Sequence, residues 1–194
     1  MKLKFHFFVF LIYLMRVGKL NKANFKMDRL WAPWRAKYIE SFASENSEEK
    51  KECLFCEKAK SSEDEKNFVL YRGEKCYIIM NLFPYNSGHI MVVPYKHTSS
   101  FSDLTDEEML DVMRVIKRGI LALEIALKPH GFNVGANLGR VSGAGIAEHI
   151  HFHIVPRWNG DTNFMPVISE TKVISELLSD TYKKLKDALS KISD

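Results

Sequence analysis

Three histidines at alternate positions have the types and the spacing to act together on one ligand. His149, His151 and His153 are separated by single bulky apolar residues. This period of two predicts a β-strand, on which one face carries the three imidazoles and the other enters a core. Same-face neighbours on a strand lie roughly 6.6 Å apart, within reach of a shared ligand. A single histidine on a strand is ordinarily a solvated or hydrogen-bonded residue, but three in register among the seven of the chain indicate a site.

Cys53 and Cys56 are candidate metal ligands. A Cys-x-x-Cys pair in a soluble enzyme is typical of a metal or redox site, and three cysteines do not indicate a disulfide framework. The third, Cys76, lies in an apolar run and is expected to be a small core residue. Two reduced core cysteines are the alternative to a metal site. The alternating histidines could also build a catalytic metal site, but no carboxylate lies within that motif to complete it.

A glycine-bearing loop immediately before the histidines is a candidate phosphate site. The loop from Ser142 to Gly145 can bring backbone N–H groups against phosphates, because glycine permits close approach. Glycine turns between strands are common, so the loop indicates a phosphate site only together with the histidines beside it.

The elements that must position these residues follow from apolar periodicity and turn signals. Short apolar runs separated by close turns predict an antiparallel sheet of five strands at 67–71, 75–80, 89–93, 132–137 and 149–155. Thr105 and Glu108 form a capping box, which predicts the start of a long helix that ends at Lys128. Its expected core face consists of Met109, Met113, Ile116, Ile120, Leu123 and Leu127. A second amphipathic helix is expected at the C-terminus, so the fold class is α+β.

Composition separates the N-terminal segment from the rest of the chain. The chain has 194 residues, of which 46% are hydrophobic and 27% charged, as in an ordinary globular protein. Residues 1–26 contain six basic and no acidic residues, so the remainder carries 22 basic against 24 acidic residues and a net charge of −2, despite the overall +4. This distribution argues against nucleic acid as the partner.

Residues 1–26 are expected to lie outside the catalytic fold. Their apolar run from Phe5 to Met15 is too short to span a bilayer as a helix, and no clear cleavage site follows it. Met27 opens a sequence that resembles a natural start, so we interpret the segment as an over-extended reading frame, with a membrane anchor as the alternative. We expect residues 27–165 to form the catalytic domain and residues 166–194 the C-terminal amphipathic helix.

The histidine run with its glycine loop resembles the histidine-triad (HIT) family of nucleotide hydrolases and transferases. The resemblance covers about residues 53–158 and includes Asn81, the pair Gly88-His89, Pro94-x-x-His97 and Asn137. The motif LWAPWR at 30–35 and the tail at 155–164 resemble the branch of diadenosine tetraphosphate phosphorylases and hydrolases. The resemblance implies a HIT-like fold, a homodimer and a cytoplasmic enzyme that cleaves dinucleoside polyphosphates, with orthophosphate slightly favoured over water as acceptor.

The resemblance also implies the roles of individual residues. His151 would attack the α-phosphorus and form a nucleotidyl-histidine, which is feasible because an imidazole with a pKa of about 6.5 is largely neutral at pH 7. His153 would donate to phosphoryl oxygens, and His89 would face the phosphate site. The remaining implied nucleotide contacts are Asn81 at the ribose, Asn137, the loop residues Ser142, Gly143, Ala144 and Gly145, and Trp158. Asn81 could instead be a turn residue, and Trp158 could cover the sheet edge rather than stack on a base.

Similarity to the zinc-bearing members of the family implies a structural zinc ion. In that interpretation His97 and His149 complete a Cys₂His₂ set with Cys53 and Cys56, which leaves no open position for catalysis. One position departs from the members that cleave phosphoramidates, which carry a polar group three residues before the first histidine of the triad. Ile146 occupies that position and cannot protonate a leaving amine, which favours a polyphosphate substrate.

Two other functional classes remain possible from the residues alone. One is a nucleotide-binding regulatory module with little turnover, which would form no adduct at His151. The other is a zinc-containing nucleic-acid binder, against which the net charge of residues 27–194 argues.

Overall fold

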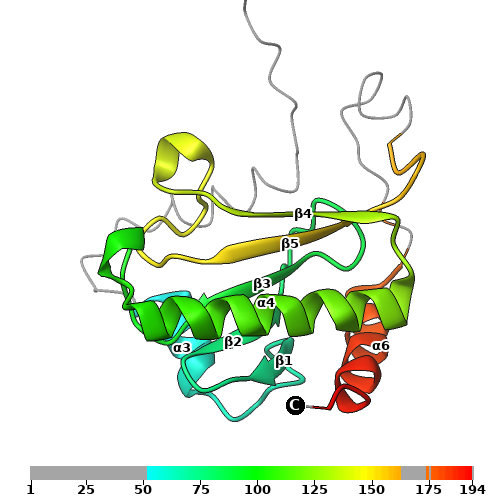
Figure 1. Cartoon of the computed structure of the whole chain (residues 1–194), viewed down its shortest axis with the longest axis horizontal. Coiled ribbons are helices and arrows are strands. Elements are labelled where there is room, and N and C mark those ends of the chain that lie inside the picture. The colour runs from blue at the N-terminus through cyan, green and yellow to red at the C-terminus, as the bar shows by residue number, and fades with distance from the viewer. Residues whose placement is uncertain (1–51, 163–173, 175, 194) are drawn as a thin grey trace, which may run out of the picture. The chain divides into compact units, whose positions relative to one another are not determined.

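The computed structural model describes residues 52–162, 174 and 176–193 (Figure 1). The predicted boundaries after residues 26 and 165, and the motif at 30–35, lie outside the described residues. Among the helices of this described part, none has both the length and the apolar character that crossing a bilayer requires.

The described residues form a five-stranded antiparallel sheet with the order β1-β2-β3-β5-β4. The strands are β1 (Val69–Arg72), β2 (Cys76–Met80), β3 (Ile90–Pro94), β4 (Gly131–Ala136) and β5 (Phe152–Arg157). The predicted sheet is therefore confirmed, and the first four strands begin within two residues of their predicted starts. The histidine-bearing strand lies between β3 and β4, so its residues are flanked by backbone on both sides (Figure 1).

The predicted start of the histidine strand was wrong by three residues, since β5 begins at Phe152 rather than at His149. Phe152 pairs with Val92, so continuing the antiparallel register would place Ile150 opposite Pro94. A proline has no N–H to give to a ladder. The Ile150 N–H instead donates to the Thr98 carbonyl at 2.7 Å, in the loop that follows β3.

The predicted alternation of faces survives this irregularity. Ile150, Phe152 and Ile154 all belong to the larger apolar core. The intervening histidines take the opposite direction, toward the second and smaller apolar cluster. The alternation therefore identified correctly which side chains of this segment enter the main core.

One face of the sheet is covered by two helices (Figure 1). The long helix α4 (Asp106–Leu127) packs on β2, β3 and β5, and α6 (Leu178–Ser190) packs on α4 and β1. The capping box is present as predicted: Glu108 N–H donates to the Thr105 hydroxyl at 3.3 Å, and Thr105 N–H donates to the Glu108 carboxylate at 2.8 Å. A 3-10 turn (Phe101–Asp103) leads into α4.

The buried face of α4 is rotated from the predicted stripe. Met113, expected in the core, is 55% exposed, whereas Val112 and Gly119 are buried. A Cβ on Gly119 would lie 3.1 Å from the terminal methyls of both Ile154 and Ile90. The helix therefore approaches the sheet most closely at a residue without a side chain, a contact that apolar periodicity does not register.

The opposite face of the sheet carries α3 (Leu54–Lys60) and the loop before β5, which contains a second 3-10 turn (Arg140–Ser142). Phe55 of α3 and Ile146 of the loop belong to the same small apolar cluster with β1, β2 and β3 residues. The guanidinium of Arg72 donates to the carbonyls of Lys58, Ala59 and Ser61 at 3.1, 2.6 and 2.6 Å. It thereby satisfies backbone acceptors at the C-terminal end of this short helix.

Candidate active site and metal site

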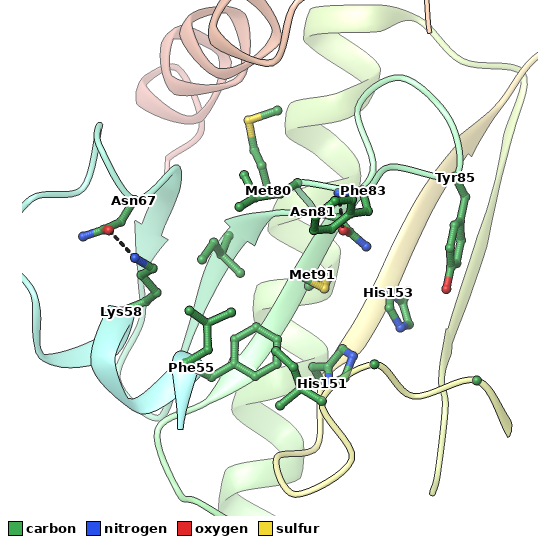
Figure 2. A pocket seen from close by; sticks show the side chains of 16 residues that line it. Phe55, Lys58, Asn67, Met80, Asn81, Phe83, Tyr85, Met91, His151 and His153 are labelled. Atoms are coloured by element: carbon green, nitrogen blue, oxygen red, sulfur yellow. Dashed lines mark hydrogen bonds between the residues drawn. The ribbon is translucent and has the colours of Figure 1, made fainter. Parts of the chain in front are cut away.

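A cavity of about 200 Å³ lies on the α3 side of the sheet and contains the predicted nucleophile (Figure 2). Its walls are mostly apolar, and its polar lining side chains are few. The apolar lining residues are Leu54, Phe55, Ile79, Met80, Leu82, Phe83, Met91 and Ile146. The other lining residues are Lys58, Asn67, Asn81, Tyr85, Gly143, Gly145, His151 and His153. A mostly apolar hollow with a few convergent polar groups is the usual form of a small-molecule site.

His151 is held in the tautomer that a nucleophile requires. Its Nδ1 lies 2.8 Å from the His149 carbonyl, which can only accept, so Nδ1 carries the ring proton. The lone pair is therefore on Nε2. His151 is 5% exposed, and burial lowers its pKa, an effect that the hydrogen bond to His149 partly opposes. The ring is thus neutral at pH 7, with an unprotonated nitrogen on a residue that lines the cavity.

His89 fixes the opposite tautomer in His153. The backbone N–H of Tyr85 donates to His89 Nδ1 at 3.1 Å, so a neutral His89 carries its proton on Nε2. That Nε2–H donates to His153 Nδ1 at 2.9 Å. His153 then carries its own proton on Nε2, where it can donate to an anionic oxygen. The ring centroids of His151 and His153 are 4.9 Å apart, so the ring that offers an acceptor nitrogen is the neighbour of the ring that offers a donor.

The loop between β2 and β3 holds the His89 end of this arrangement. Asn81 Nδ2 donates to His89 Nδ1 at 3.3 Å, while its Oδ1 accepts from Phe83 N–H at 2.9 Å. Asn86 Nδ2 donates to the Pro156 carbonyl at 3.0 Å, which ties the loop to β5. Gly88 has φ +76°, and a Cβ there would lie 2.5 Å from the Leu127 side chain. The turn before His89 therefore requires glycine.

Two aromatic rings border the histidines. Tyr85 lies 4.6 Å from the His89 ring centroid and 5.8 Å from that of His153. Phe55 lies 5.0 Å from His151 and 5.5 Å from His149. The sequence analysis did not single out either ring. The only signals were their neighbours: Phe55 stands between the two cysteines, and Tyr85 stands in the turn before Gly88.

The four predicted metal ligands come together beside the cavity. The donor atoms of Cys53, Cys56, His97 and His149 all lie within 4.8 Å of one another. Cys53 precedes α3 and Cys56 lies in its first turn, His97 follows β3, and His149 precedes β5. Three segments that are distant in sequence thus meet at this point.

The spacing of these atoms fits tetrahedral zinc. Zinc with its usual bond lengths separates two nitrogen ligands by about 3.3 Å and a sulfur from a nitrogen by about 3.6 Å. The Nδ1 atoms of His97 and His149 are 3.3 Å apart. The sulfur–nitrogen distances are 3.3 Å for Cys53–His149, 3.4 Å for Cys56–His97 and 3.6 Å for Cys56–His149. The residues present therefore fit a zinc ion.

The protonation of these ligands also favours a cation. His149 Nε2–H donates to the Pro94 carbonyl at 2.9 Å, which leaves Nδ1 as the free ligand nitrogen. Burial lowers the pKa of His149, so the ring is neutral. Burial and the neighbouring Cys53 raise the pKa of the Cys56 thiol, so two thiolates here call for a compensating positive charge.

Several predicted nucleotide contacts are not among the lining residues of the cavity. Ser142 Oγ donates to the Gly139 carbonyl at 2.7 Å, so its hydroxyl is used within its own turn. Asn137 and Ala144 do not line the cavity, and of the loop residues only Gly143 and Gly145 do. Trp158 follows the far end of β5, roughly 20 Å along an extended chain from His151. Within the described residues, the site thus contains Asn81 and two glycines of the predicted set.

The chain is similar to known proteins in both sequence and structure. Residues 62–160 match the HIT domain. The AP-4-A phosphorylase of Mycobacterium tuberculosis is 43% identical over 163 residues, which are 82% of this chain and 83% of that protein. A zinc-bound histidine triad family protein from Mycobacterium smegmatis is 25% identical with a TM-score of 0.57, over 72% of this chain and 94% of that one. A histidine triad nucleotide-binding protein from Sulfolobus tokodaii is 25% identical with a TM-score of 0.58, over 71% of this chain and 92% of that one.

Proposed function

Because the chain belongs to the HIT domain family, we propose that it cleaves dinucleoside polyphosphates of the diadenosine tetraphosphate type by nucleotidyl transfer through His151. One observation carries the proposal. The His149 carbonyl accepts from His151 Nδ1–H at 2.8 Å, so Nε2 carries a lone pair on a ring that neighbours the ring of His153. A nucleophile next to an oxyanion donor is the arrangement that phosphoryl transfer needs.

The reaction has two balanced steps. His151 Nε2 attacks an α-phosphorus, the bond to the bridging oxygen breaks, and ATP leaves as an anion. The His153 Nε2–H stabilises the non-bridging oxygens while the charge on them rises. In the second step an acceptor oxygen attacks the same phosphorus, and Nε2 leaves with its lone pair restored. Two easier displacements thereby replace one difficult displacement.

Orthophosphate is the acceptor we favour. The relative that is 43% identical is named AP-4-A phosphorylase. Phosphate as acceptor yields ADP and ATP, whereas water yields AMP and ATP. Ile146 lines the cavity and has no proton to give to a leaving amine, which agrees with an anhydride as the bond that is broken.

The zinc ion we propose at Cys53, Cys56, His97 and His149 is structural. Bound there, it would cross-link the start of α3 to the segments that follow β3 and precede β5. It uses four protein ligands, and the His151 and His153 nitrogens are not among them. Support comes from the tetrahedral spacing of the donor atoms and from the zinc-bound relative.

We also propose a homodimer and a cytoplasmic location. The β1 edge of the sheet is covered by α6, where the hydroxyl of Tyr182 donates to the Val69 carbonyl at 3.1 Å. The other edge is β4, on which Val134 is 46% exposed. An edge strand with exposed apolar side chains is a natural pairing surface for a second copy. Three free cysteines agree with a reducing compartment.

The test is rapid-quench labelling with α-labelled diadenosine tetraphosphate, followed by product analysis with and without orthophosphate. We expect label on the wild-type protein within one turnover and none on a His151→Ala variant. ADP plus ATP would identify phosphorolysis, and AMP plus ATP would identify hydrolysis. An unlabelled wild-type protein that still binds the nucleotide would contradict the covalent mechanism and indicate a binding module.

A further inference from the structure

The cavity has a second polar end, which the proposed mechanism does not use. Figure 2 shows Lys58 and Asn67 on one side of the cavity and His153 and Tyr85 on the other. The cavity walls include the apolar side chains of Leu54 and Ile79. A nucleotide has its phosphate, ribose and base in a row. With its phosphate at the histidines, such a ligand would direct its base toward Lys58.

The Lys58–Asn67 pair has a defined orientation. Lys58 Nζ lies 2.7 Å from Asn67 Oδ1. Because an ammonium group can only donate, the contacting atom of the amide must be its oxygen. Asn67 Nδ2 donates to Ser61 Oγ at 2.8 Å, which fixes the other half of the amide. The side chain of Lys58 is only 22% exposed, so this pair is largely covered by protein.

The backbone that carries the pair is fixed as well. Arg72 donates to the Lys58 carbonyl at 3.1 Å and forms an ion pair with Asp64 at 2.8 Å. Asn67 N–H donates to the Glu63 carbonyl at 3.0 Å. Both side chains therefore stand on anchored backbone, so little ordering cost remains when a ligand binds.

This pair presents one donor next to one acceptor. The Lys58 ammonium donates to Asn67 and lies 3.6 Å from the Glu57 carboxylate, which leaves its third N–H for a ligand, and the Asn67 oxygen has a second lone pair. Adenine offers the complement along one edge, with N7 as acceptor and the N6 amino group as donor. Guanine offers two acceptors there, N7 and O6, so O6 would face the Asn67 oxygen without a proton between them.

We propose that Lys58 and Asn67 read the N7/N6 edge of adenine, and that they make this site selective for adenine nucleotides over guanine nucleotides. The inference rests on the proposed function only in placing the phosphate at the histidines. A different use of Lys58, as a contact to phosphate, predicts a different outcome, because such a contact would strengthen the binding of every nucleotide alike.

The test measures equilibrium binding of AMP and of GMP to the zinc-loaded protein by calorimetry, so it does not depend on turnover. A well-placed bidentate base contact discriminates between bases by roughly 5- to 150-fold, and we expect a preference for AMP of about tenfold. Lys58→Met keeps the apolar stem and removes the donor, and Asn67→Ala removes the acceptor. Each is expected to bring the two affinities within about twofold of each other.

Lys60→Met is the matched control. Lys60 lies on the same helix, but its side chain is 72% exposed and pairs with Glu52 away from the cavity. We expect this variant to keep the full preference for AMP. Circular dichroism melts of all three variants establish that they are folded, and the Asn67 variant decides the question if Lys58→Met does not fold.

Three results would overturn the inference. They are equal affinity of the parent protein for AMP and GMP, an equal loss of both affinities in Lys58→Met, and an unchanged preference in both variants. Failure of the proposed function has a separate signature, namely no label on His151 and no cleavage of the dinucleotide. A preference for AMP that the variants abolish would stand even then.

Discussion

Replacing His89 by alanine tests how the active site sets the proton positions of its histidines. The Tyr85 N–H donates to His89 Nδ1 at 3.1 Å, and His89 Nε2–H donates to His153 Nδ1 at 2.9 Å. Without that donor, His153 can carry its proton on Nδ1 instead. Its Nε2 would then present a lone pair to the phosphoryl oxygens, which repel it. We therefore expect the variant to bind nucleotide and to transfer it slowly.

The size of the effect follows from burial. His89 is 1% exposed, so the hydrogen bond lost by His153 lies where bulk water does not reach. A buried polar group that loses its partner costs about 1–3 kcal/mol. If this cost falls on the transition state, kcat/KM decreases by about 5- to 150-fold, because 1.36 kcal/mol corresponds to a factor of ten. Direct truncation of the nucleophile, by contrast, should abolish transfer.

Two measurements check this reasoning. The first compares kcat/KM of His89→Ala for diadenosine tetraphosphate with that of Tyr85→Phe. Tyr85→Phe keeps the main-chain N–H that donates to His89, so the proton positions of the histidines are expected to be unchanged in that variant. The second measurement is ¹⁵N NMR of the imidazoles, which should find the His153 proton on Nε2 in the parent protein. A His89→Ala enzyme as active as the parent, or a parent His153 protonated on Nδ1 alone, would refute the relay.

Three further perturbations have defined outcomes. Because burial lowers the pKa of His151 below its ordinary value of about 6.5, the acid midpoint of kcat/KM should lie below pH 6.5. A midpoint above that pH would contradict this. Removal of zinc by a chelator, or Cys56→Ser, should lower Tm by about 5–10 °C, since an ion at 100 times its Kd contributes about 2.7 kcal/mol. Either change should also speed hydrogen exchange in α3, and unchanged exchange would exclude zinc as the anchor of this helix. Ile146→Ser should raise the rate of cleavage of an adenosine phosphoramidate, relative to that of diadenosine tetraphosphate, by about tenfold. This is less than the roughly 100-fold effect of a well-placed general acid. An unchanged ratio of the two rates in paired assays would show that Ile146 does not set the preference for a polyphosphate.

The parts of the fold that local sequence determines were predicted. Alternation along the histidine run placed Ile150, Phe152 and Ile154 in the core, and Thr105 with Glu108 marked the start of α4. Both signals depend on neighbours within a few residues. They are therefore readable from the chain itself.

The errors arose where a distant segment decides the local structure. The start of β5 depends on Pro94, which continuing the register would place opposite Ile150. The buried face of α4 depends on how closely Gly119 approaches the sheet, and that approach leaves Met113 exposed. Pro94 is distant in sequence from Ile150, and Ile90 and Ile154 are distant from Gly119, so the local pattern does not register these contacts.

Some residues of the candidate site could be predicted from the sequence and others could not. The alternating histidines and the cysteine pair were predicted from residue type and spacing, and Asn81, His89 and His97 from the family resemblance. The structure brings these residues together. Lys58 and Asn67 were not predicted, because a lysine on a short helix and an asparagine before a strand are ordinary surface residues by type. Only the packing of α3 against β1 and β2 turns them toward the cavity. Residues that set specificity from parts of the cavity wall outside the motifs can be recognised in the structure but not in the sequence.

The irregular start of β5 is what connects the metal site to the nucleophile. His149 uses its Nδ1 toward the thiols, its Nε2–H toward the Pro94 carbonyl, and its own carbonyl for His151 Nδ1–H. A regular ladder through residues 149–151 would direct this backbone toward a neighbouring strand, whereas here it serves the ring two residues on. An ion that fixes the His149 ring therefore also fixes the carbonyl that sets the tautomer of the nucleophile. Zinc at this position would act on catalysis through one residue, without contacting the substrate.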